Sequence, residues 1–560
     1  MPARIAALLA LVATAACGSA RTSPEPLPVE AGLPAAPGEY GGMADVLHYD
    51  VELALGAPEI IQGRATLTVR PNGAAELPLD FTGMGISAVL ADGRPAGYDY
   101  ARGKLTVTLP RGQGDADTDV VVEYFGTPDD GFVIRDNVHG DPVAFADNWP
   151  NRARFWLPSV DHPSDKATVS LTVHAPPEWQ VIGNGALVGG PAPAAADALG
   201  GGEGRNTWRW ASEVPQPTYT MVVGAADFAV ESLGRAACGS APASPDPDGC
   251  IDVSFWAYPE DVAFARQVFD RAPEMVDFFT RAIGPYPFAK LANVQSATRF
   301  GGMENASAIF YSERAIAASR LGEGTVAHEV SHQWFGDSVT EADWTHLWLS
   351  EGFATYFGAL FFEASDGIGE FRERMERSRQ SYLRSGVTAR PIVPADPPEN
   401  LFDLLNVNNY SKGAWVLHML RGVVGDETFF EGMRAYYERH AYGTVLTDDL
   451  RQAFEDVSGR PLDWFFDQWV FQPGYPMLES EWEMSGDGSE VVLTVRQTQS
   501  ADWPTFRLPL QVRVVPGEGT PGDALDATIE VTEREQMFRI SVPREPADVR
   551  IDPDGWVLKG

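Results

Sequence analysis

The sequence predicts a multidomain α+β protein with an N-terminal β-sandwich-like domain, a mixed middle domain and a C-terminal β-sandwich domain. Its 560 residues are enough for three or four domains. Short runs that alternate apolar and polar residues fill the first and last parts of the chain, whereas helix-length apolar runs fill the middle. A composition of 44% hydrophobic and 11% aromatic residues supports folded cores rather than disorder.

The first residues resemble an export signal rather than part of the fold. Arg4 precedes an apolar run from Ile5 to Ala16, which is too short for a membrane-spanning helix and typical of a secretory signal. The run ends at Cys17 in a pattern that resembles a bacterial lipoprotein cleavage box. We therefore expect a signal peptide over residues 1–17 and a lipid on Cys17.

Thr14 stands where such a box usually has Leu, so ordinary cleavage near Ala20 is the alternative. Residues 18–42 are rich in Pro, Ala and Gly and predict a flexible linker of partly extended character. We expect an exported protein, periplasmic or at the cell envelope, that contacts a bacterial membrane only through the lipid anchor at Cys17.

The rest of the chain divides into three parts. Residues 43–236 predict an all-β domain, because runs such as GRATLTVRP and DVVVEYFG are separated by Gly, Pro and Asp turns. Residues 237–475 predict the mixed middle domain, because from about Ile251 a strand-like run, DVSFWAY, is followed mainly by helical patterns. Residues 476–560 return to strand-like runs such as EVVLTVRQTQ, and we expect no helical C-terminal domain.

The stretch GTVAHEVSHQWFGDS holds two histidines four residues apart in a predicted buried helix. Because positions i and i+4 share a helix face, His328 and His332 can offer their imidazoles to one point. Glu329 is rotated about 100° from His328, which lets it contact a water at that point. This H-E-x-x-H pattern is typical of a zinc site with the Glu as general base. Two ordinary helix histidines beside a solvated Glu are the alternative.

A zinc site needs a third protein ligand, and a catalytic site keeps its fourth position for water. Glu351 lies among apolar residues of the next helical run, where a carboxylate is rarely buried unless it is paired or binds a metal. His346 is the competing ligand, but it lies near the helix start, where capping or exposure is typical. We therefore predict one zinc ion bound by His328, His332 and Glu351.

Three motifs in a fixed order resemble a known family. FGGMEN at residues 300–305 precedes H-E-x-x-H, which is followed by the Glu of WLSEGFA and then by NNYSKGA, which contains Tyr410. This combination is similar to the zinc aminopeptidase family of aminopeptidase N and leukotriene hydrolase, which are gluzincin metallopeptidases. The runs HYDVELAL and WVFQPGYPML extend the similarity along most of the chain. The resemblance implies a thermolysin-like zinc catalytic domain over residues 237–475.

The resemblance also implies a role for each matched residue. Glu329 takes a proton from a water activated by zinc and passes it to the leaving amine, and the Tyr410 hydroxyl stabilises the oxyanion. Glu304 binds the free α-ammonium of the substrate, which limits cleavage to the first peptide bond. The peptide backbone binds as an added strand along Gly301, Gly302 and Met303.

One position departs from the family. A Gln or Glu that helps to bind the amino group usually lies about a dozen residues before an Asp-x-Pro, and by this spacing the position falls on Trp149. A tryptophan cannot accept a charged hydrogen bond from an ammonium, although its face can make a cation–π contact. Asp147 or Asn148 replaces the missing group if the local register shifts.

The cysteines divide between two roles. Cys17 belongs to the signal, whereas Cys238 and Cys250 bracket a short polar loop. In an oxidising compartment we expect these two to form a disulfide, with two free loop thiols as the alternative.

The formal net charge of −36 argues against nucleic acid or an anionic membrane surface as a partner. We expect peptides with a free N-terminus as substrates, hydrolysed at the N-terminal peptide bond by an exported zinc-dependent aminopeptidase. The alternatives are an endopeptidase or an epoxide hydrolase at the same zinc site, or a catalytically silent peptide-binding protein.

Overall fold

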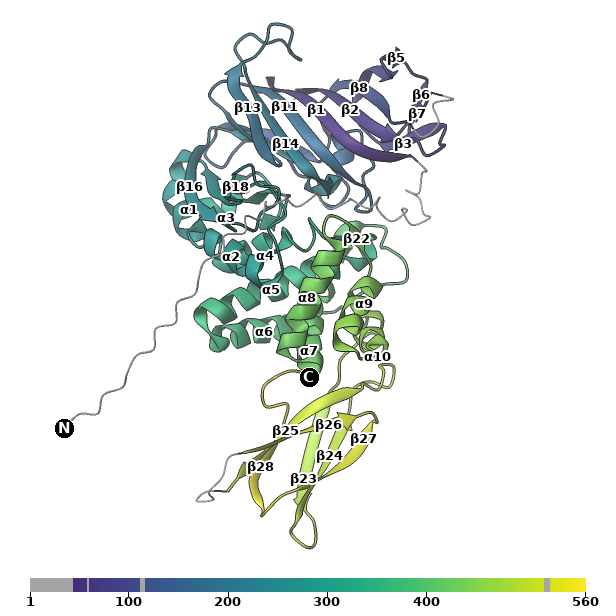
Figure 1. Ribbon diagram of the computed structural model, residues 1–560, viewed down its shortest axis with the longest axis vertical. Coiled ribbons are helices and arrows are strands. Elements are labelled where there is room, and N and C mark those ends of the chain that lie inside the picture. Colours follow the sequence, from purple (N-terminus) through teal and green to yellow (C-terminus); the bar gives the residue numbers. More distant parts are fainter. Residues whose placement is uncertain (1–43, 58–59, 111–115, 518–523) are drawn as a thin grey trace, which may run out of the picture.

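The structure is a computed structural model that describes residues 44–57, 60–110, 116–517 and 524–560. The predicted signal peptide (residues 1–17), its lipidation site Cys17 and the linker (residues 18–42) lie outside the described residues. Figure 1 shows an elongated molecule with the sheets of the N-terminal part at one end, helices in the middle and the sheets of the C-terminal part at the other end. This order of parts confirms the predicted fold class.

The N-terminal domain is built on one large sheet, which has eight strands in the described part of the chain. The second strand along the chain alternates buried and more exposed side chains, as its Val, Leu and Thr pattern predicts. The spatial order of the strands is β13 (Ala186–Pro193), β14 (Asn206–Pro217), β11 (Lys166–Ala175), β1 (Asp45–Ala57), β2 (Ile60–Arg70), β8 (Thr118–Gly126), β4 (Gly85–Ala91) and β5 (Arg94–Pro95). β1 runs parallel to β11 and antiparallel to β2.

A smaller four-stranded sheet covers one face of the large sheet. A Cβ at Gly183 would lie 2.9 Å from the side chain of Leu171 and 3.1 Å from that of Trp210 in the large sheet, so the two layers are in direct contact. This gives the predicted sandwich-like arrangement. The smaller sheet has the order β12 (Gln180–Gly183), β15 (Val223–Ala226), β10 (Pro142–Ala146) and β9 (Phe132–Asp136), and a three-stranded sheet has the order β3 (Glu76–Asp80), β7 (Lys104–Thr108) and β6 (Tyr98–Ala101).

The middle domain opens with a five-stranded sheet. Its order is β16 (Ala229–Ala236), β17 (Ile251–Ala257), β18 (Leu291–Ser296), β20 (Ala308–Ser312) and β19 (Gly302–Met303). β16 pairs antiparallel with β17, so it joins this sheet although it precedes the boundary expected after residue 236. The polar loop between these two strands has the composition of a linker, which is why the sequence pattern places the boundary there. β19 forms the opposite edge and pairs with β20.

Helices pack against this sheet, and α4 and α5 carry the H-E-x-x-H and WLSEGFA motifs. The apolar helix α5 is buried along most of its length and contacts both α4 and α7. The helices are α1 (Val262–Phe269), α2 (Ala272–Ala282), α3 (Glu313–Ala317), α4 (Glu323–His332), α5 (Trp348–Asp366), α6 (Ile368–Leu383), α7 (Gly413–Val424), α8 (Asp426–His440), α9 (Thr447–Ser458) and α10 (Asp463–Phe466). A π-helical turn, η6 (Asn408–Lys412), leads directly into α7.

The C-terminal domain consists of two three-stranded sheets that share a core. The residues after the last strand return to the middle domain, where the ring of Trp556 stacks on that of His418 in α7 with centroids 4.7 Å apart; Figure 1 shows the C-terminus beside α7. The first sheet has the order β23 (Leu478–Met484), β24 (Glu490–Gln497) and β27 (Glu535–Ser541), and the second β26 (Leu525–Val531), β25 (Leu508–Pro516) and β28 (Pro546–Ile551).

A lysine of the N-terminal domain connects it to the turn that follows α4. The Lys166 ammonium donates to the carbonyl oxygens of Asp337 at 3.0 Å, Ser338 at 2.8 Å and Gly443 at 3.1 Å. Such a contact satisfies three backbone acceptors with one side chain, and it fixes the two domains against each other next to the H-E-x-x-H helix.

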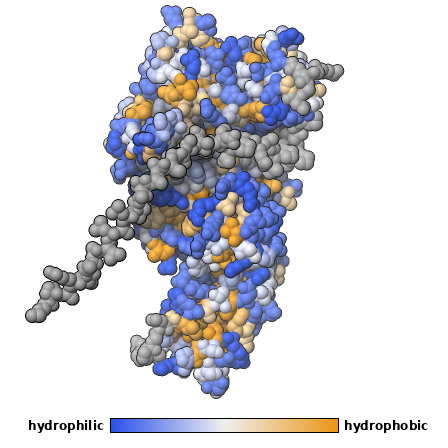
Figure 2. All heavy atoms as spheres, in the orientation of Figure 1, coloured by the Kyte–Doolittle hydropathy of each residue, from blue (hydrophilic) through white to orange (hydrophobic). Residues whose placement is uncertain are grey.

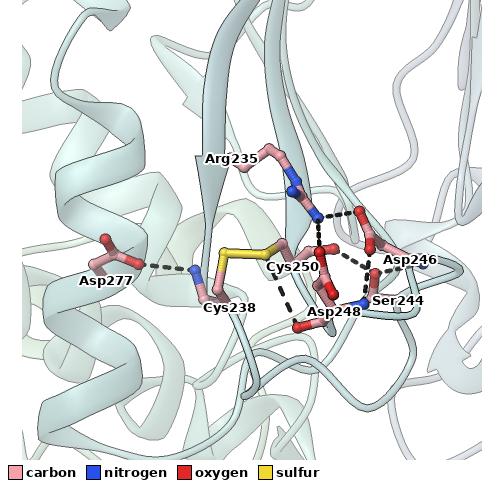
Figure 3. The surroundings of a disulfide bond; sticks show 8 residues. Arg235, Cys238, Ser244, Asp246, Asp248, Cys250 and Asp277 are labelled. Atoms are coloured by element: carbon pink, nitrogen blue, oxygen red, sulfur yellow. Dashed lines mark hydrogen bonds and ion pairs between the residues drawn. A yellow bond between two sulfur atoms is a disulfide. The ribbon is translucent and has the colours of Figure 1, made fainter.

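The disulfide between Cys238 and Cys250 is present, as predicted. It closes the polar loop between β16 and β17, and Figure 3 shows Arg235 lying against Asp246 and Asp248 of that loop. The disulfide therefore anchors the edge of the middle sheet that lies opposite β19.

The face of the molecule in Figure 2 is mainly hydrophilic, with hydrophobic residues in scattered groups, as the acidic composition predicts. Across the described ranges, no helix combines the length and the apolar character that a membrane span requires.

Candidate metal centre and active site

Three predicted ligands converge between α4 and α5. The Nε2 atoms of His328 and His332 lie 3.1 Å apart, and Glu351 Oε2 lies 3.1 Å from the first and 3.4 Å from the second. His332 and Glu351 are buried, and His328 is partly buried. The one-turn spacing of the histidines sets the first distance, and the crossing of the two helices sets the other two.

Glycine permits the close crossing of α4 and α5. A Cβ at Gly358 of α5 would lie 3.3 Å from the backbone nitrogen of His328, so a larger residue at this position pushes the helices apart. The backbone contact holds Glu351, two turns earlier on α5, within reach of both imidazoles.

A second layer of hydrogen bonds orients His332. Its Nδ1 lies 3.0 Å from the carbonyl oxygen of Phe335 and 3.1 Å from Ser350 Oγ. A ring that donates from Nδ1 to a carbonyl keeps its Nε2 lone pair for a metal. His346, the competing ligand, instead contacts Thr447 Oγ1 at 2.9 Å through its Nδ1, so it is held away from this group.

The protonation of two of the three ligands suits a metal ion, and the third must lose a proton to bind one. Burial lowers the pKa of His328, which favours the neutral imidazole. At His332 burial is outweighed by the nearby carboxylates, Glu304 first, which raise the pKa well above its ordinary value, so binding of a metal there displaces a proton. Burial raises the pKa of Glu351, but its contacts with His328 and His332 outweigh this effect and hold the pKa well below the ordinary value. A neutral imidazole and an ionised carboxylate are the forms that bind metals, and two His with one Glu form the donor set of hydrolytic zinc sites. The residues therefore fit zinc.

The predicted base Glu329 lies against the predicted substrate strand. A Cβ at Gly302 of β19 would lie 2.2 Å from Glu329 Oε1, so in this structure the carboxylate contacts the backbone of the strand directly. Glu329 is 5% exposed, and this burial raises the pKa of its carboxyl well above the ordinary value. Gly301 precedes the contact and is surrounded by open space at its Cβ position.

Glu304 lies at the end of the same strand, behind Met303. Its carboxylate, that of Glu329 and a His332 ring nitrogen all lie within 4.8 Å of one another. Burial raises the pKa of Glu304 to about 7. Two buried carboxylates this close repel each other, so a cation placed between them stabilises both in the ionised form.

Tyr410 reaches the ligand group from η6. Its hydroxyl donates to Glu351 Oε1 at 2.5 Å, and its ring stacks on that of His328 with centroids 6.0 Å apart. Burial raises the pKa of the phenol well above its ordinary value, so the group remains a proton donor in hydrogen bonds. The structure thus brings all of the predicted metal, catalytic and substrate residues to one place.

Trp149 occupies an aromatic cluster beside the substrate strand. Its ring meets those of Phe300, Trp344 and Phe402 edge to face, with centroids 6.0, 5.7 and 5.6 Å away. Phe300 directly precedes Gly301. The side chain of Trp149 is 2% exposed, so in this structure its faces pack against other rings rather than against solvent.

The two neighbouring candidates are committed to other partners. Asn148 donates to the carbonyl oxygens of Thr218 and Met221 at 3.1 and 2.6 Å. Asp147 pairs with Arg152 at 3.1 Å and with Arg299 at 3.4 Å. The two guanidiniums already compensate the charge of Asp147, so it attracts a substrate ammonium only weakly. Glu304 is therefore the carboxylate available at this end of the site.

Sequence reasoning missed several residues around the site. Ser350 contacts a metal ligand although it has no motif of its own beyond its place before Glu351. Glu341 is 1% exposed, and neither carboxylate oxygen has a hydrogen-bond partner in the structure. It lies on β21 (Thr340–Glu341), and burial raises its pKa well above the ordinary value. A Glu in an otherwise ordinary run gives no local signal of such burial.

Two family models match the chain. The Peptidase M1 N-terminal domain matches residues 46–220, and the Peptidase family M1 domain matches residues 268–469. The first range covers the large β domain. The second covers the H-E-x-x-H helix, Glu351 and Tyr410.

Relatives with assigned names are similar over most of the chain. Aminopeptidase N of Streptomyces lividans is 32% identical over 378 residues, which cover 62% of this chain and 40% of that protein. Tricorn protease-interacting factor F2 of Thermoplasma acidophilum is 26% identical over 424 residues, which cover 72% of this chain and 50% of that protein. The chain thus spans about half the length, or less, of these curated relatives.

Solved structures share the fold. An M1 zinc metallopeptidase from Deinococcus radiodurans has a TM-score of 0.63 at 25% identity and covers 76% of this chain and 93% of its own. Legionella pneumophila aminopeptidase A, solved with aspartic acid, has a TM-score of 0.77 at 18% identity and covers 92% of this chain and 59% of its own. The second likeness supports the fold alone.

Proposed function

Because the chain belongs to peptidase family M1, the family of M1 zinc metallopeptidases, we propose that it is a zinc-dependent aminopeptidase that hydrolyses the N-terminal peptide bond of peptides. The observation that carries this proposal is the contact between Glu329 and the backbone of Gly302, next to the group of His328, His332 and Glu351. It combines a base, a metal site and a strand for the substrate at one point.

β19 provides the binding edge for a peptide. It is the last strand of its sheet and pairs through Gly302 with Tyr311 and through Met303 with Phe310. The backbone groups on its other side are therefore available for an extended peptide, which adds as one more strand. The absence of side chains at Gly301 and Gly302 lets that peptide approach closely.

Glu304 anchors the free amino group. Its buried carboxylate lies near that of Glu329, and an ammonium relieves the repulsion between the two charges. Because this anchor lies at the end of β19, the first peptide bond of the substrate falls over Glu329. A blocked N-terminus loses this interaction and buries an unpaired carboxylate.

His328, His332 and Glu351 would hold the zinc ion, which would supply a Lewis acid and lower the pKa of a bound water. Glu329, which the cation held by the three ligands would keep ionised, accepts the proton of the attacking water. It then gives this proton to the nitrogen of the leaving amine. The hydroxyl of Tyr410, which stays protonated, donates a hydrogen bond to the oxygen of the cleaved carbonyl as negative charge develops there.

We also propose that the protein is exported and anchored by a lipid at Cys17. The apolar run before Cys17 and the pairing of Cys238 with Cys250 support this location. Fractionation of cells that express the wild type or Cys17→Ser tests it. The wild type should sediment with membranes and the variant should not; equal distribution of both would refute the anchor.

Cleavage assays of the purified protein test the activity. We expect release of naphthylamine from aminoacyl-naphthylamides, loss of this release with a chelator and recovery on addition of zinc. A matched N-acetylated peptide should not be cleaved. Cleavage of the acetylated peptide would instead favour an endopeptidase, and turnover of an epoxide without peptide cleavage would favour an epoxide hydrolase. Zinc binding without any turnover would favour a silent peptide-binding protein.

Glu329→Gln is the matched variant for these assays. It keeps the size of the side chain and all three metal ligands but removes the base. We expect the zinc content to match the wild type while kcat falls by roughly 10²- to 10⁴-fold. If Glu329→Gln retained the wild-type kcat with zinc bound, the proposed role of the base would be wrong.

A further inference from the structure

Gln333 is a buried amide that forms hydrogen bonds with other segments of the chain. It directly follows His332 at the C-terminal end of α4, and its side chain is 0% exposed. Its Nε2 donates to the carbonyl oxygen of Glu304 at 3.0 Å and to Asp337 Oδ2 at 2.7 Å. Its Oε1 accepts from the backbone nitrogen of Ser307 at 2.8 Å and lies 3.3 Å from the Tyr286 hydroxyl, which donates at 2.8 Å to the carbonyl oxygen of Lys290.

Three of these contacts fix the orientation of the amide. Both N–H donors face a carbonyl or carboxylate oxygen, and the amide oxygen faces a backbone N–H. Exchange of the oxygen and nitrogen would place donors against Ser307 and acceptors against Glu304. The amide therefore acts as a rigid link between the metal helix and the segment 304–307.

The segment 304–307 is held from both sides. Ser307 has a φ of +64°, a conformation that costs energy for a residue with a side chain, so its surroundings must impose it. Gln333 holds the backbone of Ser307 from the metal helix, while the backbone nitrogen of Gly185 donates to Ser307 Oγ at 2.8 Å from the N-terminal domain. Asn184 donates to the carbonyl oxygen of Ala306 at 2.8 Å.

We propose that Gln333 is a positioning residue for amino-group recognition, an inference that rests on the proposed aminopeptidase function. It acts through the backbone of Glu304, because its amide sets the distance between that residue and His332, its own neighbour on α4. The distance between the anchor of the ammonium and the metal site then determines that the first peptide bond, and no other, lies over Glu329.

The removal of this link predicts a selective defect. Gln333→Met keeps the approximate volume of the side chain but removes its hydrogen bonds, so the Glu304 backbone is free to shift while His328, His332 and Glu351 are unchanged. Ligands that use the ammonium should bind more weakly, whereas ligands that use only the metal should not.

The experiment compares leucine hydroxamate with 4-methylpentanehydroxamic acid, which lacks the amino group. The inhibition constant of 4-methylpentanehydroxamic acid divided by that of leucine hydroxamate measures how much the ammonium adds to binding. We expect this ratio to fall by about tenfold or more in Gln333→Met, as the loss of a well-placed charged hydrogen bond implies. The inhibition constant of the compound without the amino group and the zinc content should stay within about twofold of wild type. KM for aminoacyl-naphthylamides should rise more than kcat falls.

Gln497→Met is the matched control. Gln497 is also a buried amide, which donates to the carbonyl oxygen of Phe506 at 2.7 Å and accepts from its backbone nitrogen at 2.8 Å, but it lies in the C-terminal domain. Its loss should lower thermal stability in the same way as Gln333→Met without any change in the inhibitor ratio. If Gln333→Met fails to fold, Gln333→Glu serves instead, because it keeps the acceptor for Ser307 and loses the donor to Glu304.

The outcomes separate the two proposals. A ratio near one in the wild type would show that the site does not recognise the amino group, which refutes the proposed aminopeptidase function. A large ratio in the wild type that persists in the folded Gln333 variant would refute only the positioning role. An equal loss of affinity for both inhibitors would also refute it, because that pattern indicates a general structural defect.

Discussion

Gly352 and Gly413 lie in backbone contact: a Cβ on either residue would lie 2.9 Å from backbone atoms of the other. Gly352 follows the metal ligand Glu351 on α5, and Gly413 starts α7 just after η6. The contact brings α5 and η6 together so that the Tyr410 hydroxyl reaches Glu351 Oε1 at 2.5 Å. The close approach of α5 to the start of α7 therefore requires glycine at both positions, one in WLSEGFA and one in NNYSKGA.

Gly413→Ala should separate these elements and misplace Tyr410. We expect kcat/KM for an aminoacyl-naphthylamide to fall by roughly 10²-fold, because an oxyanion donor shifted by about 1 Å loses most of its effect, while the zinc content is retained. The matched control is Gly369→Ala on α6, where a Cβ would meet nothing within 4 Å. If both variants had the same kcat/KM, the glycine contact would not matter for Tyr410.

Gly336→Ala should weaken zinc binding through the second layer of the site. Gly336 has a φ of +122°, and a Cβ there would lie 2.6 Å from Ser350 Oγ and 3.0 Å from His332 Nδ1. Disturbed contacts to a ligand imidazole typically lower metal affinity by about 10- to 100-fold. Chelator competition measures the affinity, with Gly322→Ala, which meets nothing within 4 Å, as the control. An unchanged affinity would contradict the role of this layer.

His418→Gln should reduce the loss of stability in acid. His418 contacts the Tyr356 hydroxyl through Nδ1 at 3.2 Å and the carbonyl oxygen of Gly555 through Nε2 at 3.2 Å, and burial lowers its pKa to about 3. An unfolded histidine has a pKa near 6.5, so between these values the unfolded state binds the extra proton. The free energy of unfolding therefore falls as the pH drops from about 6.5 towards 3.

The size of this effect follows from the interval of pH. As the pH falls from 6.5 to 4.5, protonation of His418 in the unfolded state should lower the free energy of unfolding of the wild type by about 2 to 3 kcal/mol. Thermal unfolding of the wild type and His418→Gln at pH 7 and pH 4.5 measures the difference. Equal shifts of the midpoint in both proteins would mean that His418 does not titrate in this way.

Removal of the disulfide should lower stability but not activity. Closing a loop of this size constrains the unfolded chain by roughly 3 kcal/mol, so Cys238→Ser/Cys250→Ser should unfold at a lower temperature. The disulfide lies at the edge of the middle sheet opposite β19, and kcat/KM should therefore match the wild type below the unfolding temperature. A large fall in kcat/KM of the folded variant would show that the β16 edge of the sheet, which carries the disulfide, is coupled to the β19 edge.

The metal ligands could be predicted because local patterns encode them. The spacing of His328 and His332 sets one helix face, and the apolar surroundings of Glu351 indicate a buried carboxylate. The H-E-x-x-H pattern also indicated Glu329, and the resemblance to the family added Glu304 and Tyr410; the structure brings all three to the same place. The order of the three domains could also be predicted from the sequence, because the periodicity of apolar residues distinguishes strands from helices.

Other features could not be predicted from local patterns. Gln333 looks like any polar residue after a helix, and its four contacts come from segments up to 47 residues away in sequence. Trp149 was one of three candidates for a position beside a substrate ammonium, and the structure surrounds it with rings from three other segments. β16 precedes a loop that resembles a linker, yet it pairs with the strand beyond that loop.

The sequence by itself determined the class of the fold and predicted the metal ligands, because helix and strand periodicities and buried carboxylates are properties of neighbouring residues. The tertiary structure decided which residues orient those ligands, where the substrate strand lies relative to the base and how closely helices approach. Those relationships depend on contacts between distant segments, such as Gly352 with Gly413 and Gln333 with Glu304, which form only when the packed core fixes the elements against one another.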